Sequence, residues 1–350
     1  MAFENLAEKL AKKAFLSPDI QKSWAGHMAA FGPILEPAFA QDYQSRVHLT
    51  AALNLISNKK IAEGLKKLQS LQAKCSNNAD KAALLFFMGV GFEMAGQQEQ
   101  MLTCYSYANE YEHPFYLPYL KAAKFYLNGR MYDKAADHFR RSIDCFTATG
   151  LDDQRRLILG SAYANYATCL MMMHHYEEAE AALATSRNLY PDGIGRAATE
   201  ATLYALRQDA AQAEACLAVL KEHAPDAWEE VNETVRNVLA QKDPLFFPVA
   251  LDTDQIAQFW NWFVPQEPEL VSMLNREEYE AAVTAVAEQL LVAFPFLEEQ
   301  PYIALGKDDT GFILELHDMY AVAVTKAYES LLEHRPGEKE NHAIRLVIVH

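Results

Sequence analysis

A pattern of small residues at fixed spacing recurs five times in this chain and constrains its fold more than any other feature. The segment 163–191 has the apolar spacing of two short helices joined by a turn, and the same frame recurs from residues near 45, 82, 116, 160 and 194. Nine of the ten residues at the eighth and twentieth frame positions are Gly or Ala, which lets paired helices cross closely. The pattern therefore predicts a series of helix pairs. The ten residues are Ala52, Gly64, Gly89, Met101, Ala123, Ala135, Ala167, Ala179, Ala201 and Ala213.

The stretch from about 45 to 226 resembles the tetratricopeptide repeat, a helix–turn–helix unit of about 34 residues. Bulky apolar residues occupy the eleventh and twenty-fourth positions of each frame, and Pro191 and Pro225 close the last two. The resemblance implies an α-α superhelix, a solenoid of about five helix pairs.

The repeats depart from the family pattern at three places. Glu200 stands where an apolar residue is expected, and Ser76 stands where the first frame would end in proline. Ten additional residues follow Phe146, and they imply a longer helix or a loop between the third and fourth units.

Segments on both sides of the repeats are expected to cap the solenoid, because a terminal repeat would otherwise expose its apolar face. We assign 1–44 to N-terminal capping helices, with one amphipathic helix at 3–16. Residues 226–241 form the expected C-terminal capping helix, so the repeat domain covers 45–243. The apolar stripe of this helix is Trp228, Val231, Val235 and Val238.

Residues 244–350 have a different character and predict a small α+β domain with the order β-α-α-β-β-α-β. The apolar run 245–251 predicts the first strand, and Asp252 is placed to cap the first helix. A hairpin around 303–316, a helix from 318 to about 334 and a last strand at 343–350 complete the prediction. The expected fold class is thus mainly α, a tetratricopeptide-like solenoid followed by an acidic α+β domain.

The negative charge is concentrated in this C-terminal part. The chain has a formal charge of −16, and residues 244–350 contribute −12 of it, from 6 basic and 18 acidic side chains. Such a balance argues against a nucleic-acid partner, whose phosphates need clustered Lys and Arg. It favours a basic protein partner for the C-terminal domain, with solubility as the simpler explanation.

Several features predict a cytoplasmic protein without a membrane segment. The first residues show no basic stretch followed by an apolar core, and the five cysteines are widely spaced. Residues 157–176 lack charged side chains over a length that could span a bilayer, but they contain five polar residues and fall within a repeat. We interpret them as a buried helix.

No catalytic, metal-binding or cofactor-binding motif is present, so the sequence predicts no cofactor and no metal. Glu315 and His317 share one strand face close to Asp308 and Asp309, which is compatible with an acid–base pair or a metal site but lacks diagnostic spacing. The sequence 174–178, with two His and two Glu, is interpreted as a polar turn between repeat helices.

The tetratricopeptide resemblance places a binding groove on the concave surface, along the first helix of each unit. Family members that bind acidic peptide tails use Lys, Arg and Asn at the fifth and ninth positions, and here only Lys124 could contact a carboxylate. The groove would therefore suit a protein or peptide with an apolar or amphipathic segment. Its candidate residues are Leu49, Leu53, Phe86, Val90, Leu120, Lys124, Ala164, Thr168, Met171 and Met172. The alternative is that the N-terminal region or the C-terminal domain of the same chain fills the groove.

The sequence thus favours a non-enzymatic protein- or peptide-binding scaffold, with the acidic domain as a second contact. The second hypothesis is an enzyme or small-ligand sensor with a site in the C-terminal domain or at the domain junction. A third is a peptide-sensing regulator, for which no basic DNA-binding head is visible.

Overall fold

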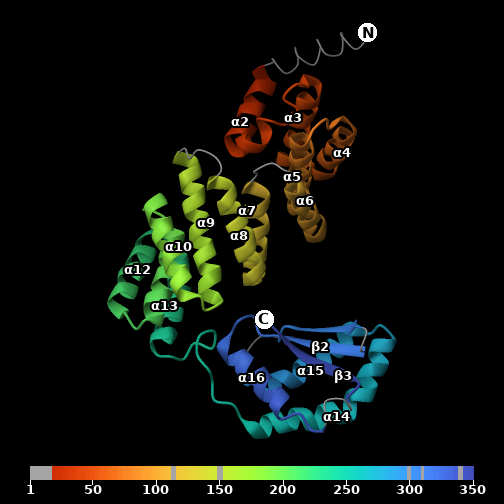
Figure 1. Ribbon diagram of the computed structural model, residues 1–350, viewed down its shortest axis with the longest axis vertical. Helices are drawn as coiled ribbons and strands as arrows, with labels where there is room; N and C mark the ends of the chain where they lie inside the picture. The colour runs from red at the N-terminus through yellow and green to blue at the C-terminus, as the bar shows by residue number, and fades with distance from the viewer. Residues whose placement is uncertain (1–17, 112–115, 148–152, 298–300, 309–310, 338–341) are drawn as a thin grey trace. The chain divides into compact units, whose positions relative to one another are not determined.

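The computed structural model describes residues 18–111, 116–147, 153–297, 301–308, 311–337 and 342–350. Within these ranges, 15 α-helices follow one another in packed pairs, and a three-stranded sheet lies near the C-terminus (Figure 1). The predicted fold class, helix pairs followed by a small α+β domain, is confirmed.

Two compact units emerge from the contacts between residues. The first unit comprises the chain up to Gly129 together with Asp133–Tyr166. The second comprises Arg130–Tyr132 and Ala167–His350. This division does not coincide with the expected boundaries at 44/45 and 243/244, which stay predictions.

The helix pairs begin close to the predicted frame starts. Helix α9 contributes residues to both units, because the division at 166/167 falls within it. The helices up to and including α9 are α2 (Pro18–Leu35), α3 (Tyr43–Ser57), α4 (Ile61–Leu71), α5 (Asn78–Met94), α6 (Gln98–Glu110), α7 (Tyr116–Asn128), α8 (Tyr132–Thr147) and α9 (Asp153–Met172), with a 3₁₀ turn at Gln72–Lys74. They are followed by α10 (Tyr176–Leu189), α11 (Ile194–Leu206), α12 (Ala210–His223) and α13 (Pro225–Leu239). Part of the insertion after Phe146 lengthens α9 to 20 residues, and 148–152 lie outside the described residues.

All ten residues at the predicted crossing positions are buried. A Cβ atom at Gly89 would lie 2.5 Å from the ring of Tyr105, and one at Gly64 would lie 2.6 Å from the side chain of Ile56. Real Cβ contacts are longer than this, so the helices of these two pairs approach too closely for any larger residue. The physical reason for the small-residue pattern is therefore confirmed.

Polar networks explain two of the departures from the repeat pattern. The amide and hydroxyl of Ser76 both donate to Oδ2 of buried Asp80, while the amide of Phe39 donates to Oδ1 at 2.6 Å. Glu200 is buried and accepts a hydrogen bond from Arg187 at 2.7 Å. The Nε of Arg196 lies 2.9 Å from the same oxygen without a well-directed hydrogen bond. Each buried carboxylate thus has compensating partners.

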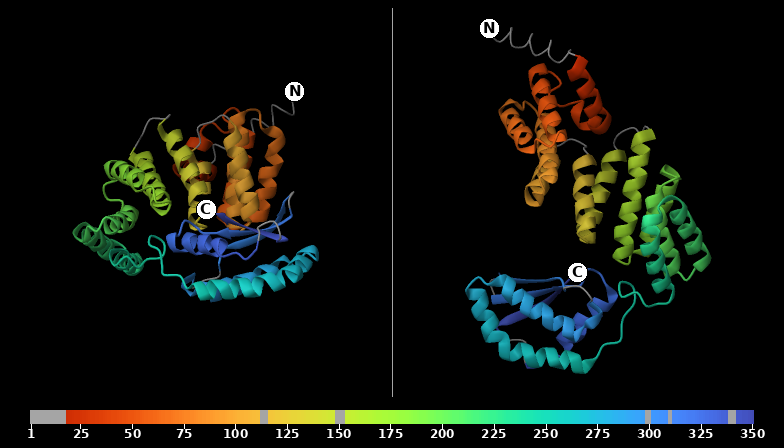
Figure 2. Two further views of the ribbon diagram at one scale, coloured as in Figure 1. Left: turned by 60° about the horizontal axis from the view of Figure 1, so that its bottom comes forward. Right: turned by 180° about the vertical axis from the view of Figure 1, so that it is seen from behind.

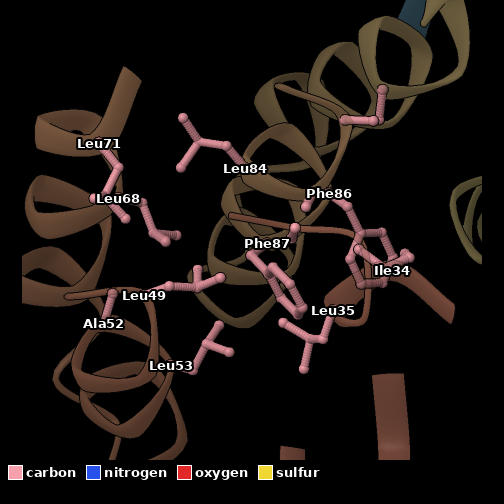
Figure 3. Packing of buried hydrophobic residues seen from close by; sticks show 14 of the residues in the cluster. Ile34, Leu35, Leu49, Ala52, Leu53, Leu68, Leu71, Leu84, Phe86 and Phe87 are labelled. Carbon is pink, nitrogen blue, oxygen red and sulfur yellow. The ribbon is translucent and has the colours of Figure 1, made fainter. Parts of the chain in front are cut away.

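Apolar residues of α2 to α6 form the core of the first unit. Figure 3 shows Ile34 and Leu35 of α2 beside Phe86 and Phe87 of α5, with Leu49 and Leu53 of α3 directed toward the same interior. Helix α2, which is kinked at Phe31, packs on α3 and α5, and its capping role stays a prediction. The predicted helix at 3–16 lies outside the described residues.

The segment expected to form a C-terminal capping helix is helical, as α13, which packs against α11 and α12 and buries Val235 and Val238, while Trp228 and Val231 are partly buried. Its capping role stays a prediction. Residues 157–172 belong to α9, but 173–175 form the turn to α10 and Leu157 is 46 % exposed, so the expected buried helix over 157–176 is shorter and only partly buried. Among the residues that the structure describes, no helix combines the length and apolar character needed to cross a membrane.

The C-terminal α+β part contains three helices and three strands. They are α14 (Thr253–Asn275), α15 (Tyr279–Ala293), a 3₁₀ turn at Pro295–Leu297, β1 (Ile303–Asp308), β2 (Gly311–His317), α16 (Val322–Glu333) and β3 (Ile344–Val349). The sheet order is β1-β2-β3, with β1 antiparallel and β3 parallel to β2. Figures 1 and 2 show α15 between the sheet and α14. The predicted hairpin, the cap at Asp252 and the inward face of β3 are confirmed.

The strand predicted at 245–251 is wrong, because this segment forms turns and irregular structure. The carbonyls of Pro244 and Leu245 accept hydrogen bonds from the amides of Ala323 and Val322, the first turn of α16. These two carbonyls therefore accept hydrogen bonds from free amides at the start of a helix, and not from the amides of a neighbouring strand. The helix predicted from 318 begins instead at Val322, because residues 318–321 form a tight loop.

Replacing Gly89 by Ala should destabilise the protein by about 1–3 kcal/mol, because the added methyl group meets the Tyr105 ring. Gly26 is the matched control, since it lies in α2 and a Cβ added there would have no neighbouring atom within 4 Å. Gly26→Ala should stabilise by roughly 0.5–1 kcal/mol through helix propensity. Urea denaturation of the three proteins measures both values, and equal effects at the two sites would refute close crossing at Gly89.

Acidification should destabilise the first unit through His138 of α8. Burial lowers the pKa of this imidazole, against an opposing effect of Asp137, and its ring stacks on Tyr126 with centroids 5.2 Å apart. The unfolded chain then takes up a proton near pH 6.5 that the folded chain does not. The contribution of His138 to the free energy of unfolding is therefore fully present above pH 6.5. It decreases as the pH is lowered further, by at most about 1.4 kcal/mol per pH unit for one group.

Unfolding free energies at pH 7.5 and 5.5 test this expectation. His138→Phe keeps a stacked ring and should reduce the pH dependence, while His223→Gln, at an exposed position of α12, should not change it. His48, whose pKa burial also lowers, accounts for part of the remaining slope. An unaltered slope in His138→Phe would contradict the assignment.

Candidate functional site

Most of the predicted groove residues are buried. Six of the ten are in the interior, three are partly buried, and Lys124 is exposed. The six are Leu49, Leu53, Phe86, Leu120, Ala164 and Met171, and the three are Val90, Thr168 and Met172. Their grouping as one binding surface stays a prediction.

Phe86 illustrates what covers these residues in the first unit. Its ring lies 5.8 Å from that of Phe31, 5.1 Å from that of Phe87 and 5.8 Å from that of Tyr105, all measured between centroids. Phe31 belongs to α2, and Ile34 of the same helix lies next to Phe86 in Figure 3. At this position the N-terminal region fills the surface, in line with the self-filled alternative.

A different apolar surface is open on the first unit. We call it the α5–α6 groove, a depression of about 450 Å³ lined by Gln72, Cys75, Lys81, Leu84, Leu85, Met88, Tyr107 and Tyr111. Tyr107 is 51 % exposed, and the Lys81 ammonium lies 5.5 Å from the Tyr111 ring centroid. The groove presents aromatic and aliphatic side chains with one cation at its edge. None of its residues belongs to the predicted groove set.

The second unit contains a cavity of about 310 Å³ beside the start of α16, which we call the α16 pocket. Its lining consists entirely of second-unit residues and is mostly apolar. The residues are Arg130, Pro244, Leu245, Phe296, Leu297, Pro301, Tyr302, His317, Asp318, Met319, Ala321, Val324 and Tyr328. The pocket adjoins His317, where the second sequence hypothesis expected a concave site.

Tyr328 is the most unusual residue of the α16 pocket. It is fully buried, with its ring 6.3 Å from that of Phe294, and its hydroxyl has no hydrogen-bond partner among the described residues. Burial and the charge of Asp318 raise the pKa of the phenol, so the hydroxyl stays protonated and can donate. An unsatisfied buried hydroxyl costs about 1–3 kcal/mol.

The loop between β2 and α16 borders the same pocket and is strained. Met319 and Tyr320 both have positive φ angles, 51° and 61°, in the region that non-glycine residues rarely occupy. Buried Asp318 holds them: its carboxylate accepts hydrogen bonds from the Tyr320 amide at 3.0 Å and from the Thr325 hydroxyl at 2.5 Å. Nδ1 of His350 lies 2.8 Å from the same carboxylate. Strain of this kind persists only where the surroundings enforce it.

His174 connects this loop to the helical part of the second unit. Its Nε2 lies 2.7 Å from the Tyr320 carbonyl oxygen and its Nδ1 lies 2.8 Å from the Tyr176 hydroxyl. With Nε2 carrying the proton, the ring donates to the carbonyl and accepts from the phenol. The interpretation of 174–178 as a simple polar turn therefore missed a structural role that depends on a residue 146 positions away.

The acid–base and metal candidates gain little from the structure. Oε2 of Glu315 lies 3.3 Å from Nε2 of His317, while Asp309 lies outside the described residues. His175 and Glu178 are 3.7 Å apart at exposed positions. Across the described ranges, no group of three or more His, Cys, Asp or Glu side chains is placed to hold a metal ion.

All five cysteines are free thiols. Burial raises the pKa of Cys75, Cys104 and Cys216 to about 11 and that of Cys169 to about 12. Burial also raises the pKa of Cys145. Since the thiolate is the nucleophile, these groups are poorly suited to covalent catalysis at neutral pH.

Comparisons with known proteins give a weak structural likeness to a repeat protein. No protein-family profile matches the chain, and no curated protein matches it. A crystal structure of the C-terminal part of a TPR repeat-containing protein from Cytophaga hutchinsonii aligns with 71 % of this chain and 95 % of its own, at 14 % identity and a TM-score of 0.29. At that similarity it carries no argument about function, which rests on the residues themselves.

Asp318→Ala should destabilise the protein by about 2–4 kcal/mol, because it removes the acceptor of both the Tyr320 amide and the Thr325 hydroxyl. Thr325→Val removes one donor to the same carboxylate and should cost about 1 kcal/mol. Scanning calorimetry of both variants tests the ranking. If Asp318→Ala were the milder change, the carboxylate would not be what maintains this loop.

Proposed function

We propose that this protein is a helical-repeat scaffold that binds a protein or peptide partner through its first unit. The observation that supports this most is the α5–α6 groove, because Tyr107 is exposed and Met88 and Tyr111 are partly exposed, whereas most of the predicted groove residues are buried. The proposal keeps the partner class expected from sequence and moves its contact to a different surface.

The groove has the chemistry of a site for an amphipathic segment. Exposed Tyr107 offers a large, rigid contact of the type that dominates binding energies at interfaces. Partly buried Met88 can adjust to the shape of a partner. Lys81 at the edge would favour an acidic group on that partner. The expected ligand is a helical or extended segment with apolar anchors and an Asp or Glu beside them.

The acidic C-terminal part is proposed as a second contact, for a basic partner. The carboxylates of Glu277, Glu280 and Glu288 on and near α15 are exposed. Glu278 is engaged by Arg276 at 3.0 Å and is less available. A contact of this kind depends on charge and weakens with salt.

Peptides selected from a displayed library against the full chain test the groove. We expect selected peptides to carry two or more apolar anchors, and Tyr107→Ala to weaken their binding at least tenfold, which corresponds to about 1.4 kcal/mol. Lys81→Gln should weaken peptides that contain an acidic residue by a smaller factor. Isothermal titration calorimetry measures both effects.

The matched control is Val219→Ala, another exposed apolar position, on α12 of the second unit, which should leave affinity unchanged. Raising the salt concentration from 0.15 to 1 M should change the groove contact little. Peptides that bind Tyr107→Ala and the unaltered protein equally well would refute the groove as the binding site.

The second sequence hypothesis, an enzyme or small-ligand sensor, is favoured by one observation, the α16 pocket with its unpartnered hydroxyl. The cysteines have raised pKa values, and the Glu315–His317 pair has no third group placed with it among the described residues. Binding is therefore a better-supported role for this pocket than catalysis.

A further inference from the structure

We infer that the outer edge of β1 accepts an extended, basic segment of a partner protein as a fourth strand of the sheet. This inference rests on the proposed function, because it specifies the second contact, the one between the acidic C-terminal part and a basic partner. It involves no residue of the α5–α6 groove.

Strand β1 lies at one end of the sheet, and every second residue of it turns its backbone groups away from β2. The amide of His317 donates to the Tyr302 carbonyl at 2.9 Å. Because the register places Ile303 opposite Leu316, residues 302 and 317 form a hydrogen-bonded pair of the antiparallel ladder. Such pairs alternate along a ladder, so the odd-numbered residues of β1 direct their amides and carbonyls to the outer edge. These residues are Ile303, Leu305 and Lys307.

This outer edge is accessible and largely lacks the features that block strand addition. Within the described ranges, the edge-facing amides and carbonyls form no hydrogen bond outside the sheet. Residues 303–306 are partly exposed, and Lys307 is exposed. Edge strands are commonly protected by bulges, prolines or lysines. Here the register runs without a bulge from Ile303 to Asp308, β1 contains no proline, and its one lysine lies near the hairpin turn. The edge over 303–306 is therefore open to an added strand.

The two faces of β1 define the side chains that an added strand should carry. Ile303 and Leu305 pack against the core of the α+β part, so residues of the added strand on that face should be apolar. Ala304 and Gly306 lie on the opposite face together with Glu315, which the register places opposite Ala304. The expected segment thus alternates apolar and polar residues.

Glu315 and the small residues beside it explain why the polar positions should be basic. The Glu315 side chain is 39 % exposed and belongs to β2, two strand spacings, or about 10 Å, from an added strand. On this face β1 presents only the methyl group of Ala304 and the hydrogen of Gly306. A Lys or Arg side chain is long enough to cross them and pair with the carboxylate. Tyr302, which is 55 % exposed, offers its ring to the same cation.

The charges around Glu315 restrict where the basic residue can lie. Nε2 of His317 is 3.3 Å from the carboxylate, and Arg345 lies on the same face of β3, on the side away from β1. The Lys307 ammonium lies 5.4 Å from the Phe312 ring centroid at the hairpin end. A basic residue is therefore expected beside Ala304 and not beside Lys307. The charge of −12 on residues 244–350 attracts such a segment at long range.

The probe is a labelled peptide of sequence Thr-Val-Lys-Val-Arg-Val-Thr with blocked ends, titrated with the full chain by fluorescence anisotropy. Strand addition engages alternate amides of the peptide, those of the valines if it pairs antiparallel and the others if it pairs parallel. N-methylation of one alternate set should weaken binding at least tenfold, whereas N-methylation of the other set should weaken it less than threefold. Equal effects of the two sets, or no binding of the basic peptide, would overturn the inference.

Variants of Glu315 test the basic side chains. Glu315→Gln should weaken the basic peptide at least fivefold and leave a neutral peptide, with Gln in place of Lys and Arg, unaffected. Glu229→Gln removes the same charge at an exposed position of α13 and should change neither affinity. An unchanged affinity of the basic peptide for Glu315→Gln would contradict the assigned ion pair.

Two variants at one position test the edge amides. Lys307→Pro removes an amide that faces outward, where proline is tolerated, and Lys307→Gln removes the same charge but keeps the amide. The proline variant should bind the basic peptide at least threefold more weakly than the glutamine variant. If the two variants bound it equally, the peptide would not be adding to this edge.

Hydrogen exchange provides a readout that does not depend on affinity. Saturating basic peptide should slow amide exchange in residues 303–307 several-fold, because the edge amides gain acceptors. Unchanged exchange there, with the peptide bound, would overturn strand addition and leave the proposed basic contact in place at another surface. Binding of the groove-selected peptides should be the same in Lys307→Pro, which separates a failure at β1 from a failure of the groove proposal.

Discussion

The close crossing of paired helices is the constraint on which the helical part of the structure depends. At Gly64 and Gly89 the partner side chain occupies the space that a Cβ would need, and Ala takes the same role at most other crossings. Because the small residues at the crossing bury little apolar surface, each pair also relies on bulky buried residues around it, such as Leu68 and Tyr105. Each pair then needs a neighbour, and α2 packs beside α3 and α5 in the first unit as α13 packs beside α11 and α12 in the second.

The same need for cover decides which surfaces remain accessible to a partner. In the first unit α2 supplies Phe31, Ile34 and Leu35 to the apolar side chains of α3 and α5, so residues predicted to line a groove became core. The surface that α2 leaves uncovered includes Tyr107 and Met88. The surface accessible to a peptide is therefore the one that α2 does not cover.

The helix pairs and the hairpin could be predicted because their signals are local. Crossing residues recur at fixed spacing, and apolar side chains alternate along β2. The prediction of a strand at 245–251 was wrong because a short apolar run does not reveal which donors its backbone carbonyls will meet. Those of Pro244 and Leu245 accept hydrogen bonds from the first turn of α16. No local pattern in the sequence distinguishes Tyr328, for the same reason. Its importance lies in an absent partner, which depends on residues brought together by the fold. The link from His174 to Tyr320 was equally invisible, since it joins residues far apart in the sequence.

The loop at Met319 and Tyr320 has a consequence for communication within the second unit. One face of it borders the α16 pocket, and the Tyr320 carbonyl is held by His174 at the turn between α9 and α10. Two left-handed residues in succession leave few intermediate conformations, so a change at Met319 alters the acceptor that His174 needs. A ligand that displaced this loop would therefore have to move the Tyr320 carbonyl and break its contact with His174, so the pocket and the turn between α9 and α10 are joined through one contact.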